Sequence, residues 1–270
     1  MILPLLSCIQ DPVMQNLTIP DLAGRAVLVT GGSTGIGAAL VEAYAAQGCK
    51  VGLHYNASKD AAEAVATRAR ADGGDVFVIK GDLSVSGETR RVVDETAAYF
   101  GRLDGLVNNA GGMVARVTYA DMTDAHYDRV MDLNARSVVI AVQAALPHLK
   151  REGGFIINTS SVAARNGASN GAGIYGSSKA FVSNVTRGMA KEFAPFNVRV
   201  NAVAPGVIQT PFHERYSTEA QMNAMVATIP MGHAGSPKDC AGAFLFLSSP
   251  MLSGYVTGQV IEVNGGQLMP

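Results

Sequence analysis

The sequence predicts a single α/β domain in which a parallel sheet is covered by helices on both faces. Three observations support this prediction. Apolar runs with the character of strands alternate with helical patterns along the chain, as parallel strands with helical crossovers require. A glycine-rich turn joins the first run to the first helical segment, as in a phosphate-binding βα unit. The length of 270 residues suits one such domain, which we expect to occupy residues 17–270.

The expected strands and helices follow one another from residue 26 to the end of the chain. The strands are short apolar runs at residues 26–29, 50–55, 76–79, 105–107, 155–158, 198–203 and 259–263. Helix stop signals include Gly73, Gly101 and Pro195, and either Thr123 or Asp124 is expected to cap the longest helix. The helices are expected at residues 38–44, 60–71, 86–100, 124–149, 175–193 and 237–247.

Two segments depart from the alternating pattern. Residues 1–16 are apolar at the start but lack a basic region and contain Pro4 and Pro12, so they predict neither a secretion signal nor a membrane span. We expect a flexible extension there, or an upstream start that contributes nothing. Residues 209–234 are polar and contain Pro211 and Pro230, which predicts a mobile helical lid over the site.

Composition narrows the class of protein. A formal net charge of −1 argues against nucleic acid as the main partner, because binding to phosphates needs a basic face. Charged residues make up 16% and apolar residues 48%, which predicts a large core and surface buried between subunits. Cys8, Cys49 and Cys240 are scattered and show no metal-ligand spacing, so we expect no zinc site, no disulfide framework and a reducing, cytoplasmic setting.

The glycine-rich turn is the first candidate binding element. Its glycines, Gly31, Gly35 and Gly37, give the pattern G-x-x-x-G-x-G, with Thr30 ahead of it. Glycine lets the backbone approach a pyrophosphate closely, and the free N–H groups of the following helix favour its charge. A tight connection without a ligand is the alternative reading of this turn alone. The other residues of the turn included in the expected cofactor site are Ser33, Thr34 and Ile36.

Polar clusters follow three later strands. They are residues 108–111 after the fourth strand, Ser160 and Ser161 after the fifth, and Pro205-Gly206 after the sixth. Ligands bind open α/β sheets at the carboxyl ends of the strands. Each cluster alone is explained by the formation of a turn. Three clusters at the same edge of the sheet, beside a phosphate loop, predict a ligand-binding site.

Tyr175 and Lys179 are spaced i, i+4 on an expected helix, so their side chains share one face. A phenol with a pKa of about 10 is a poor base at neutral pH, and a nearby ammonium lowers that pKa. Such a pair is common on surface helices. The pair indicates a catalytic site only when it occurs together with the serine and the phosphate loop.

These motifs together resemble the short-chain dehydrogenase/reductase family, from about Asp21 to the end of the chain. They are T-G-x-x-x-G-x-G at 30–37, N-N-A-G at 108–111, Y-x-x-x-K at 175–179 and Pro205-Gly206. The resemblance implies a seven-stranded Rossmann fold, doubly wound, with helices on both faces. It also implies hydride transfer between a nicotinamide dinucleotide and an alcohol or ketone.

The resemblance implies a role for each matching residue. Tyr175 would be the acid/base, and Ser161 would orient the substrate oxygen. Lys179 would hold the nicotinamide ribose and lower the pKa of the tyrosine, while Asn134 would support a proton-relay water. The remaining cofactor contacts would come from Asp82 and Leu83 near adenine, from Asn109, Ala110 and Gly111, and from Pro205, Gly206, Ile208 and Thr210.

One departure from the family concerns the loop before Tyr175, which looks slightly longer than usual. Ser160 would lie further still from Tyr175, so Ser161 is preferred as the catalytic serine. The extra residue fits most easily within 165–173.

The expected cofactor preference depends on the end of the second strand. An acidic residue there would bind the ribose 2′-hydroxyl of NAD and repel a 2′-phosphate, and none is present. Asn56 and Ser58 can donate hydrogen bonds to a phosphate, and Lys59 is close. Thr34 argues the other way, because NADP-preferring relatives often carry a basic residue there. The sequence favours NADP(H) over NAD(H).

The expected function is reversible oxidation of a secondary alcohol to a ketone, with a small-molecule substrate. The sequence resembles 3-oxoacyl-carrier-protein reductases and sugar or polyol dehydrogenases about equally. A non-catalytic dinucleotide sensor would not need the serine, tyrosine and lysine together, and a nucleotide-sugar epimerase would need a larger substrate domain. His213, Glu214 and Arg215 would contact a polyhydroxylated or anionic substrate, or form a solvated lid face, which we favour.

The sequence also predicts self-association. The helix at 175–193 carries Phe181, Val182, Val185 and Met189, and residues 260–270 are largely apolar. We expect these surfaces to pack across two-fold axes in a homotetramer or dimer, as the family resemblance implies. The alternative is that they complete the monomer core.

Overall fold

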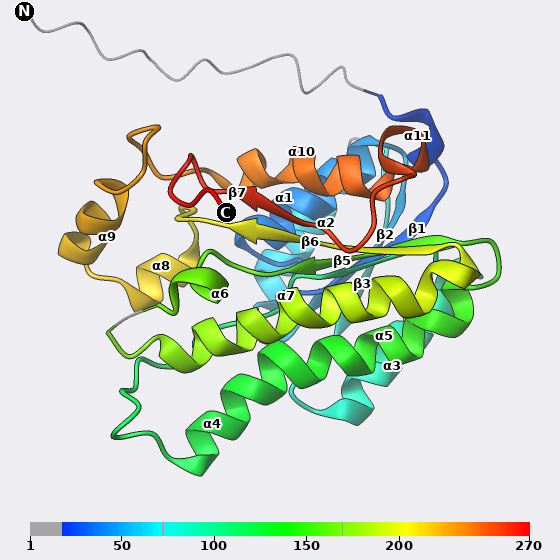
Figure 1. Cartoon of the computed structure of the whole chain (residues 1–270). Helices are drawn as coiled ribbons and strands as arrows, with labels where there is room; N and C mark the ends of the chain where they lie inside the picture. The colour runs from blue at the N-terminus through cyan, green and yellow to red at the C-terminus, as the bar shows by residue number, and fades with distance from the viewer. Residues whose placement is uncertain (1–17, 72, 169) are drawn as a thin grey trace, which may run out of the picture.

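A seven-stranded parallel sheet forms the centre of the molecule (Figure 1). The computed structural model describes residues 18–71, 73–168 and 170–270, so the expectation for residues 1–16 falls outside it. The strand order is β3-β2-β1-β4-β5-β6-β7, and every neighbouring pair is parallel. This arrangement confirms the predicted fold class. The strands are β1 (Ala26–Val29), β2 (Lys50–Tyr55), β3 (Asp75–Lys80), β4 (Gly105–Asn108), β5 (Gly154–Thr159), β6 (Val198–Pro205) and β7 (Val260–Val263).

Helices cover both faces of this sheet (Figure 1). Apolar side chains of α1, α2 and α10 pack on one face, and those of α3, α5 and α7 on the other. The helices are α1 (Gly35–Ala46), α2 (Lys59–Ala71), α3 (Ser86–Phe100), α4 (Asp124–Met131), α5 (Ser137–Leu149), α6 (Ala163–Asn166), α7 (Gly173–Phe193), α8 (Pro211–Tyr216), α9 (Glu219–Val226), α10 (Pro237–Ser248) and α11 (Pro250–Ser253).

Strand β1 is apolar at every position, and its packing explains why. Val27 and Val29 belong to the core beneath α1 and α10, whereas Leu28 between them belongs to the opposite core. Successive side chains of a strand point to opposite faces, so a strand covered on both sides buries all of them. The expectation that helices cover both faces is therefore confirmed.

The helix expected at 124–149 is wrong in one respect, because it is interrupted. Residues Asp132–Arg136 form a π-helical turn between α4 and α5. Such turns insert an extra residue into a helix and occur often at functional sites. Of the two expected caps, Thr123 and Asp124, the structure shows Thr123. Its hydroxyl accepts a hydrogen bond from the N–H of His126 at 3.2 Å.

The apolar face of α7 differs from the expectation that it lies between subunits. Val182 and Met189 are buried within the chain itself, and Val185 is partly buried against the same core. Of the four apolar residues named for this face, only Phe181 is exposed, at 39%. These residues mainly complete the monomer core.

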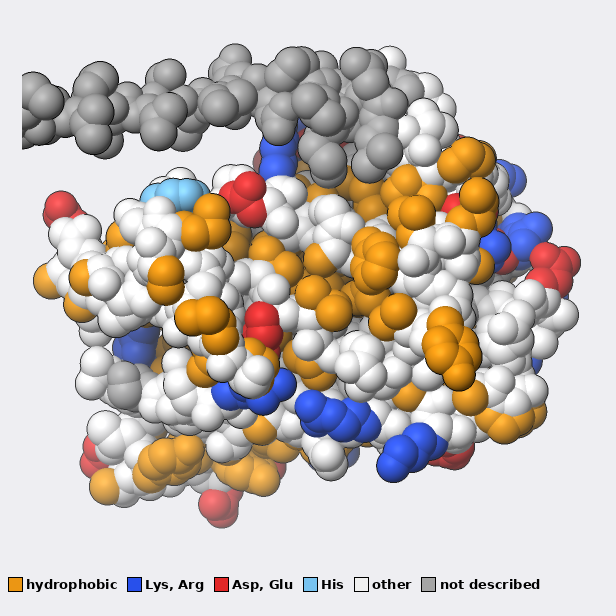
Figure 2. Space-filling view, turned by 45° about the horizontal axis from the view of Figure 1, so that its top comes forward, with side chains coloured by type: hydrophobic (Ala, Val, Ile, Leu, Met, Phe, Trp, Pro, Cys, Tyr) orange, Lys and Arg blue, Asp and Glu red, His pale blue; other side chains and the backbone are white. Residues whose placement is uncertain are grey.

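Exposed apolar side chains gather instead near the end of the chain. Figure 2 shows hydrophobic side chains spread over the face that carries α10, α11 and the C-terminal segment. The exposed large ones in this part of the chain are Phe246, Met251, Leu252, Tyr255 and Met269.

The described part of the chain contains neither a membrane-spanning helix nor a cluster of metal ligands. No helix there has both the length and the apolar character needed to cross a membrane. Nor do three His, Cys, Asp or Glu side chains gather there in a group suited to a metal ion.

Candidate active site

A cleft of about 740 Å³ lies at the carboxyl ends of the central strands. It brings together almost all of the site residues predicted from the sequence. Asp82 and Asn134 do not line it, although both lie next to residues that do. The predicted residues along its wall are Gly31, Ser33, Thr34, Gly35, Ile36, Gly37, Asn56, Leu83, Asn109, Ala110, Gly111, Ser161, Tyr175, Lys179, Pro205, Gly206, Ile208 and Thr210.

The glycine-rich turn has the geometry that a phosphate loop needs. Gly31 and Gly35 have positive φ angles of 67° and 55°, a region that favours glycine. A Cβ atom on Gly37 would lie 2.0 Å from the carbonyl oxygen of Gly31, so no side chain fits there. Helix α1 begins at Gly35, and its free N–H groups face the cleft end of the turn. These residues fit the pyrophosphate of a dinucleotide.

Thr30 joins this turn to the segment after β4. Its hydroxyl donates to the carbonyl of Val107 at 3.1 Å. The same oxygen accepts hydrogen bonds from the N–H groups of Asn109 at 2.9 Å and Ala110 at 3.0 Å. The side-chain amide of Asn109 donates to the carbonyl of Thr30 at 3.0 Å. The two cofactor-binding segments are therefore held together by reciprocal hydrogen bonds.

His54 is a supporting residue that the sequence analysis missed. Its Nδ1 accepts a hydrogen bond from the N–H of Gly31 at 3.1 Å, and its Nε2 lies 3.0 Å from the carbonyl of Gly81. This pattern requires the neutral tautomer with the proton on Nε2. The ring is buried, and burial lowers its pKa, which favours the same neutral form. The signal in the sequence was a polar residue in an otherwise apolar strand.

Tyr175 and Ser161 lie next to each other in the cleft. The Ser161 side chain interacts with the Tyr175 phenol and acts to lower its pKa. Ser160 points elsewhere, because its hydroxyl contacts the hydroxyl of Ser183 at 2.6 Å and donates to the carbonyl of Lys179 at 3.1 Å. This geometry supports the choice of Ser161 over Ser160 despite the longer loop before Tyr175.

Burial dominates the titration of both Tyr175 and Lys179. It raises the pKa of Tyr175 to about 12, although the hydrogen bond with Ser161 acts in the opposite direction. It lowers the pKa of Lys179 to about 8. The expectation that Lys179 lowers the tyrosine pKa stays a prediction. The Lys179 ammonium lies 5.9 Å from the Tyr175 ring centroid and donates to the carbonyl of Thr159 at 2.8 Å.

Asn134 occupies the π-helical turn and is fully buried. Its Oδ1 accepts from the N–H of Gly112 at 3.0 Å, and its Nδ2 donates to the carbonyls of Gly112 and Val130, each at 2.8 Å. A Cβ on Gly111 would lie 2.7 Å from this Oδ1 and 3.1 Å from the Lys179 Nζ. Asn134 and Lys179 therefore both approach Gly111, and the relay role of Asn134 stays a prediction.

Helix α8 lines another part of the cleft. The Phe212 ring lies 5.5 Å from the Tyr175 ring and 5.0 Å from the Tyr216 ring. His213 and Arg215 line the cleft, whereas Glu214 between them does not. Arg116, from the segment after β4, also lines it and was missed by the sequence analysis. The position of a basic side chain on an irregular segment cannot be predicted from a single sequence.

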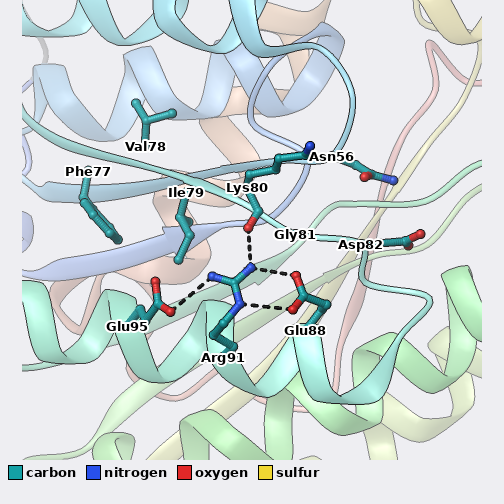
Figure 3. A pocket seen from close by; sticks show the side chains of 10 residues that line it. All are labelled: Asn56, Phe77, Val78, Ile79, Lys80, Gly81, Asp82, Glu88, Arg91 and Glu95. Carbon is teal, nitrogen blue, oxygen red and sulfur yellow. Dashed lines mark hydrogen bonds and ion pairs between the residues drawn. The ribbon is translucent and has the colours of Figure 1, made fainter.

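A second hollow of about 660 Å³ adjoins the cleft at Asn56 (Figure 3). Arg91 within it is bound by Glu88 at 2.7 Å, by Glu95 at 3.2 Å and by the carbonyl of Lys80 at 2.7 Å. The Lys80 side chain extends toward Asn56 in Figure 3, which agrees with the pairing of Lys80 with Tyr55 across β2 and β3. Lys80 was also missed, because its nearness to Asn56 depends on strand register.

Comparisons with known proteins agree with this geometry. The family profile described as Enoyl-(Acyl carrier protein) reductase matches residues 31–267. The 3-oxoacyl-[acyl-carrier-protein] reductase FabG of Staphylococcus aureus (strain Mu50) is 37% identical over 246 residues, covering 91% of this chain and 98% of that protein. NADPH-dependent aldehyde reductase 1, chloroplastic, of Arabidopsis thaliana is 35% identical and covers 92% of this chain and 88% of that protein.

Two solved structures are similar over nearly the whole chain. The NADH-dependent reductase A1-R′ complexed with NAD has a TM-score of 0.84 and 36% identity, covering 94% of this chain and 100% of that one. A short chain dehydrogenase from Burkholderia cenocepacia J2315 in complex with NADP has a TM-score of 0.86 and 33% identity, covering 92% and 99%.

Proposed function

The chain belongs to the short-chain dehydrogenase/reductase family of NAD(P)-dependent oxidoreductases, and we propose that it interconverts a secondary alcohol and a ketone by hydride transfer. The observation that carries this proposal is that Tyr175, Ser161 and Lys179 lie together in the cleft, with the Lys179 ammonium 5.9 Å from the Tyr175 ring centroid. These three groups supply a proton donor, an oxygen-orienting hydroxyl and a cation.

Tyr175 is proposed to move the proton. Its raised pKa keeps the phenol protonated at neutral pH, which is the form that donates a proton to the oxygen of a ketone being reduced. Ser161 is proposed to donate a hydrogen bond to the same oxygen and to stabilise the charge that develops there. The nicotinamide dinucleotide supplies or accepts the hydride at the carbonyl carbon when bound. The wall residues named above are proposed to bind it.

Lys179 and Asn134 are proposed to support these two hydroxyl groups. Lys179 is buried, at 4% exposure, and its ammonium is oriented by the carbonyl of Thr159. From this position it would bind the nicotinamide ribose. Asn134 would hold a relay water near the ammonium, next to Gly111.

Two classes of substrate are proposed for this reaction. The similarity to FabG of S. aureus supports a 3-oxoacyl thioester as the substrate. The similarity to a reductase responsible for alginate metabolism supports a sugar or polyol. A coupled absorbance screen of acyl thioesters, sugars and polyols with both cofactors tests the proposal. Absence of NAD(P)H-linked turnover with every carbonyl and alcohol class would contradict it.

NADP(H) is proposed as the preferred cofactor. No Asp or Glu is among the described residues that line the cleft itself, and Asn56 and Ser58 offer hydrogen-bond donors. The acids Asp82, Glu88 and Glu95 line the adjoining hollow, where Glu88 and Glu95 are paired with Arg91. Lys80 adds a cation that extends toward Asn56 (Figure 3). Similar structures contain either NAD or NADP, so the preference rests on these residues.

Placing a carboxylate at the end of β2 tests the preference. Asn56→Asp is expected to shift the ratio of NADPH to NADH affinity toward NADH by at least about tenfold, through repulsion of the 2′-phosphate. Lys80→Gln is expected to weaken NADPH binding and to leave NADH binding unchanged. Fluorescence titration measures both, with Asn223→Asp on α9 as the control. If the unmodified protein already binds NADH more tightly, the preference is wrong.

A homo-oligomer in the cytoplasm is proposed as the working form. The exposed apolar side chains around α10, α11 and the C-terminal segment support the assembly (Figure 2). The free thiols Cys49 and Cys240 are buried, which is compatible with a reducing compartment.

Sedimentation equilibrium at micromolar concentration tests the assembly. We expect a mass of two or four times 28.1 kDa, because burying these apolar side chains between copies removes them from water. Met251→Lys places a charge on this surface and is expected to shift the equilibrium toward the monomer, whereas Lys191→Gln on the exposed part of α7 is the control. A single species of 28.1 kDa in the unmodified protein would contradict the proposal.

A further inference from the structure

The charged side chains of the cleft wall are all basic. No Asp or Glu belongs to the wall as the described residues form it, whereas Arg116, Lys179 and Arg215 do. Lys179 is assigned to the cofactor ribose, which leaves two guanidinium groups and His213 on the substrate side. From this arrangement we infer that the substrate is an alcohol or ketone carrying a separate oxyanion, a carboxylate or a phosphate. The inference rests on the proposed function and names its substrate class.

Arg116 is held in place at the wall. Its Nε donates to the carbonyl of Tyr216 at 2.6 Å, and its Nη1 donates to the carbonyl of Asn170 at 3.1 Å. Both partners are carbonyl oxygens, and their hydrogen bonds orient the guanidinium at the cleft wall. An oriented guanidinium is well suited to a planar carboxylate or to a phosphate.

The positive charge of Arg116 acts within the cleft. Burial lowers the pKa of His213, and the charge of Arg116 lowers it further. The two side chains therefore share one electrostatic environment, although they come from segments about a hundred residues apart. A neutral His213 still offers a ring nitrogen for hydrogen bonding, and its Nδ1 lies 3.1 Å from the Ser217 hydroxyl.

Helix α8 connects this basic region to the reacting groups. Phe212 packs between the Tyr175 and Tyr216 rings, and the carbonyl of Tyr216 accepts the hydrogen bond from Arg116. Arg215 lies on the same helix, is exposed, and takes part in none of the ion pairs among the described residues. A substrate whose oxygen meets Tyr175 would thus place its other end near two cations.

The cofactor does not account for this charge by itself. The pyrophosphate is expected at the glycine-rich turn and the start of α1, which lie against Thr210 and Pro211. Arg116 instead belongs to the segment after β4 and bonds to the carbonyls of Tyr216 and Asn170. A cation in a partly closed cleft is stabilised when an anion binds beside it, because the attraction is stronger there than in bulk water.

Matched pairs of acids and amides test the inference by kinetics. We would compare 3-oxobutanoate, 4-oxopentanoate and 5-oxohexanoate with their amides, and dihydroxyacetone phosphate with dihydroxyacetone. The best anionic member is expected to exceed its neutral partner by about 10–100-fold in kcat/KM, the range typical of a charge-assisted hydrogen bond. The keto acids and the phosphate distinguish the two kinds of oxyanion.

Variants assign the preference to the two arginines. Arg215→Gln and Arg116→Gln are expected to reduce the ratio of acid to amide kcat/KM by about tenfold or more, with the KM for NADPH unchanged. Arg129→Gln on the exposed part of α4 removes the same charge outside the cleft and should leave the ratio intact. Arg215 is exposed, so its variant keeps the test valid if Arg116→Gln fails to fold.

Binding separates this inference from the proposed function. Calorimetric titration of the protein–NADPH complex with 3-hydroxybutanoate and 3-hydroxybutanamide involves no turnover, because the reduced cofactor cannot accept a hydride from the alcohol. We expect tighter binding of the acid. Equal or tighter binding of the amide, or variants that change only the KM for NADPH, would overturn the inference while the oxidoreductase activity stands. Selective binding of the acid without turnover of any carbonyl would contradict the proposed function alone.

Discussion

Replacing Tyr175 with phenylalanine is expected to lower kcat by about 10²–10⁴-fold, the usual contribution of a general acid. The substitution removes one oxygen and keeps the ring that packs against Phe212, so the cleft should retain its shape. Dinucleotide affinity is expected to stay nearly unchanged, because the phenol acts on the proton of the substrate. Steady-state kinetics and fluorescence titration of the cofactor measure the two quantities separately.

Tyr127→Phe serves as the control for this change. It removes the same oxygen from an exposed phenol on α4 and should leave kcat unaltered. Turnover near the wild-type rate in Tyr175→Phe would remove Tyr175 from the mechanism. A parallel loss of cofactor affinity would indicate a structural role for its hydroxyl.

Lys179→Met should impair both cofactor binding and turnover, because the ammonium is proposed to hold the ribose and to support the tyrosine. Methionine has a similar length and suits the buried position without a charge. We expect a loss of about tenfold or more in NADPH affinity, and a further loss of kcat. Lys191→Met, at an exposed position of the same helix, is the control.

The pH dependence gives this prediction a second readout. Burial lowers the pKa of Lys179 to about 8, so the ammonium is charged below that pH and loses its charge as the pH rises through it. The kcat/KM for NADPH is therefore expected to fall above about pH 8 in the unmodified protein. Lys179→Met has no charge to lose, and persistence of the same fall in that variant would show that another group titrates.

Much of the fold could be predicted because its signals are local. The apolar runs, the stop signal at Gly101 and the glycine-rich turn each act over a few residues, and the observed elements begin and end close to the expected positions. The interruption between α4 and α5 was missed, because a π-helical turn changes the hydrogen bonds and leaves the apolar pattern nearly continuous. The surface of α7 was misjudged because an apolar stripe does not say which partner covers it.

The candidate site divides in the same way. Tyr175 and Lys179 could be predicted because i, i+4 spacing on a helix fixes a shared face. His54 and Lys80 could not, since their contacts with Gly31 and the Asn56 region depend on how β2 and β3 pair with their neighbours. Arg116 lies on an irregular segment, and its orientation depends on contacts with Tyr216 and Asn170 far along the chain.

The π-helical turn at Asp132–Arg136 also sets the rotational phase of two helices. One extra residue turns everything after it by about 100° around the helix axis, since a regular helix has about 3.6 residues per turn. Asn134 lies within the turn and contacts Gly112. Helix α5 follows the turn, and its buried side packs in the same core as α3. Deleting one residue here would restore a regular helix that could satisfy only one of these two contacts. The length of this segment is therefore constrained both by the contact of Asn134 with Gly112 and by the core, and insertions or deletions should be tolerated far less here than at the 3₁₀ turn Ala194–Phe196 after α7.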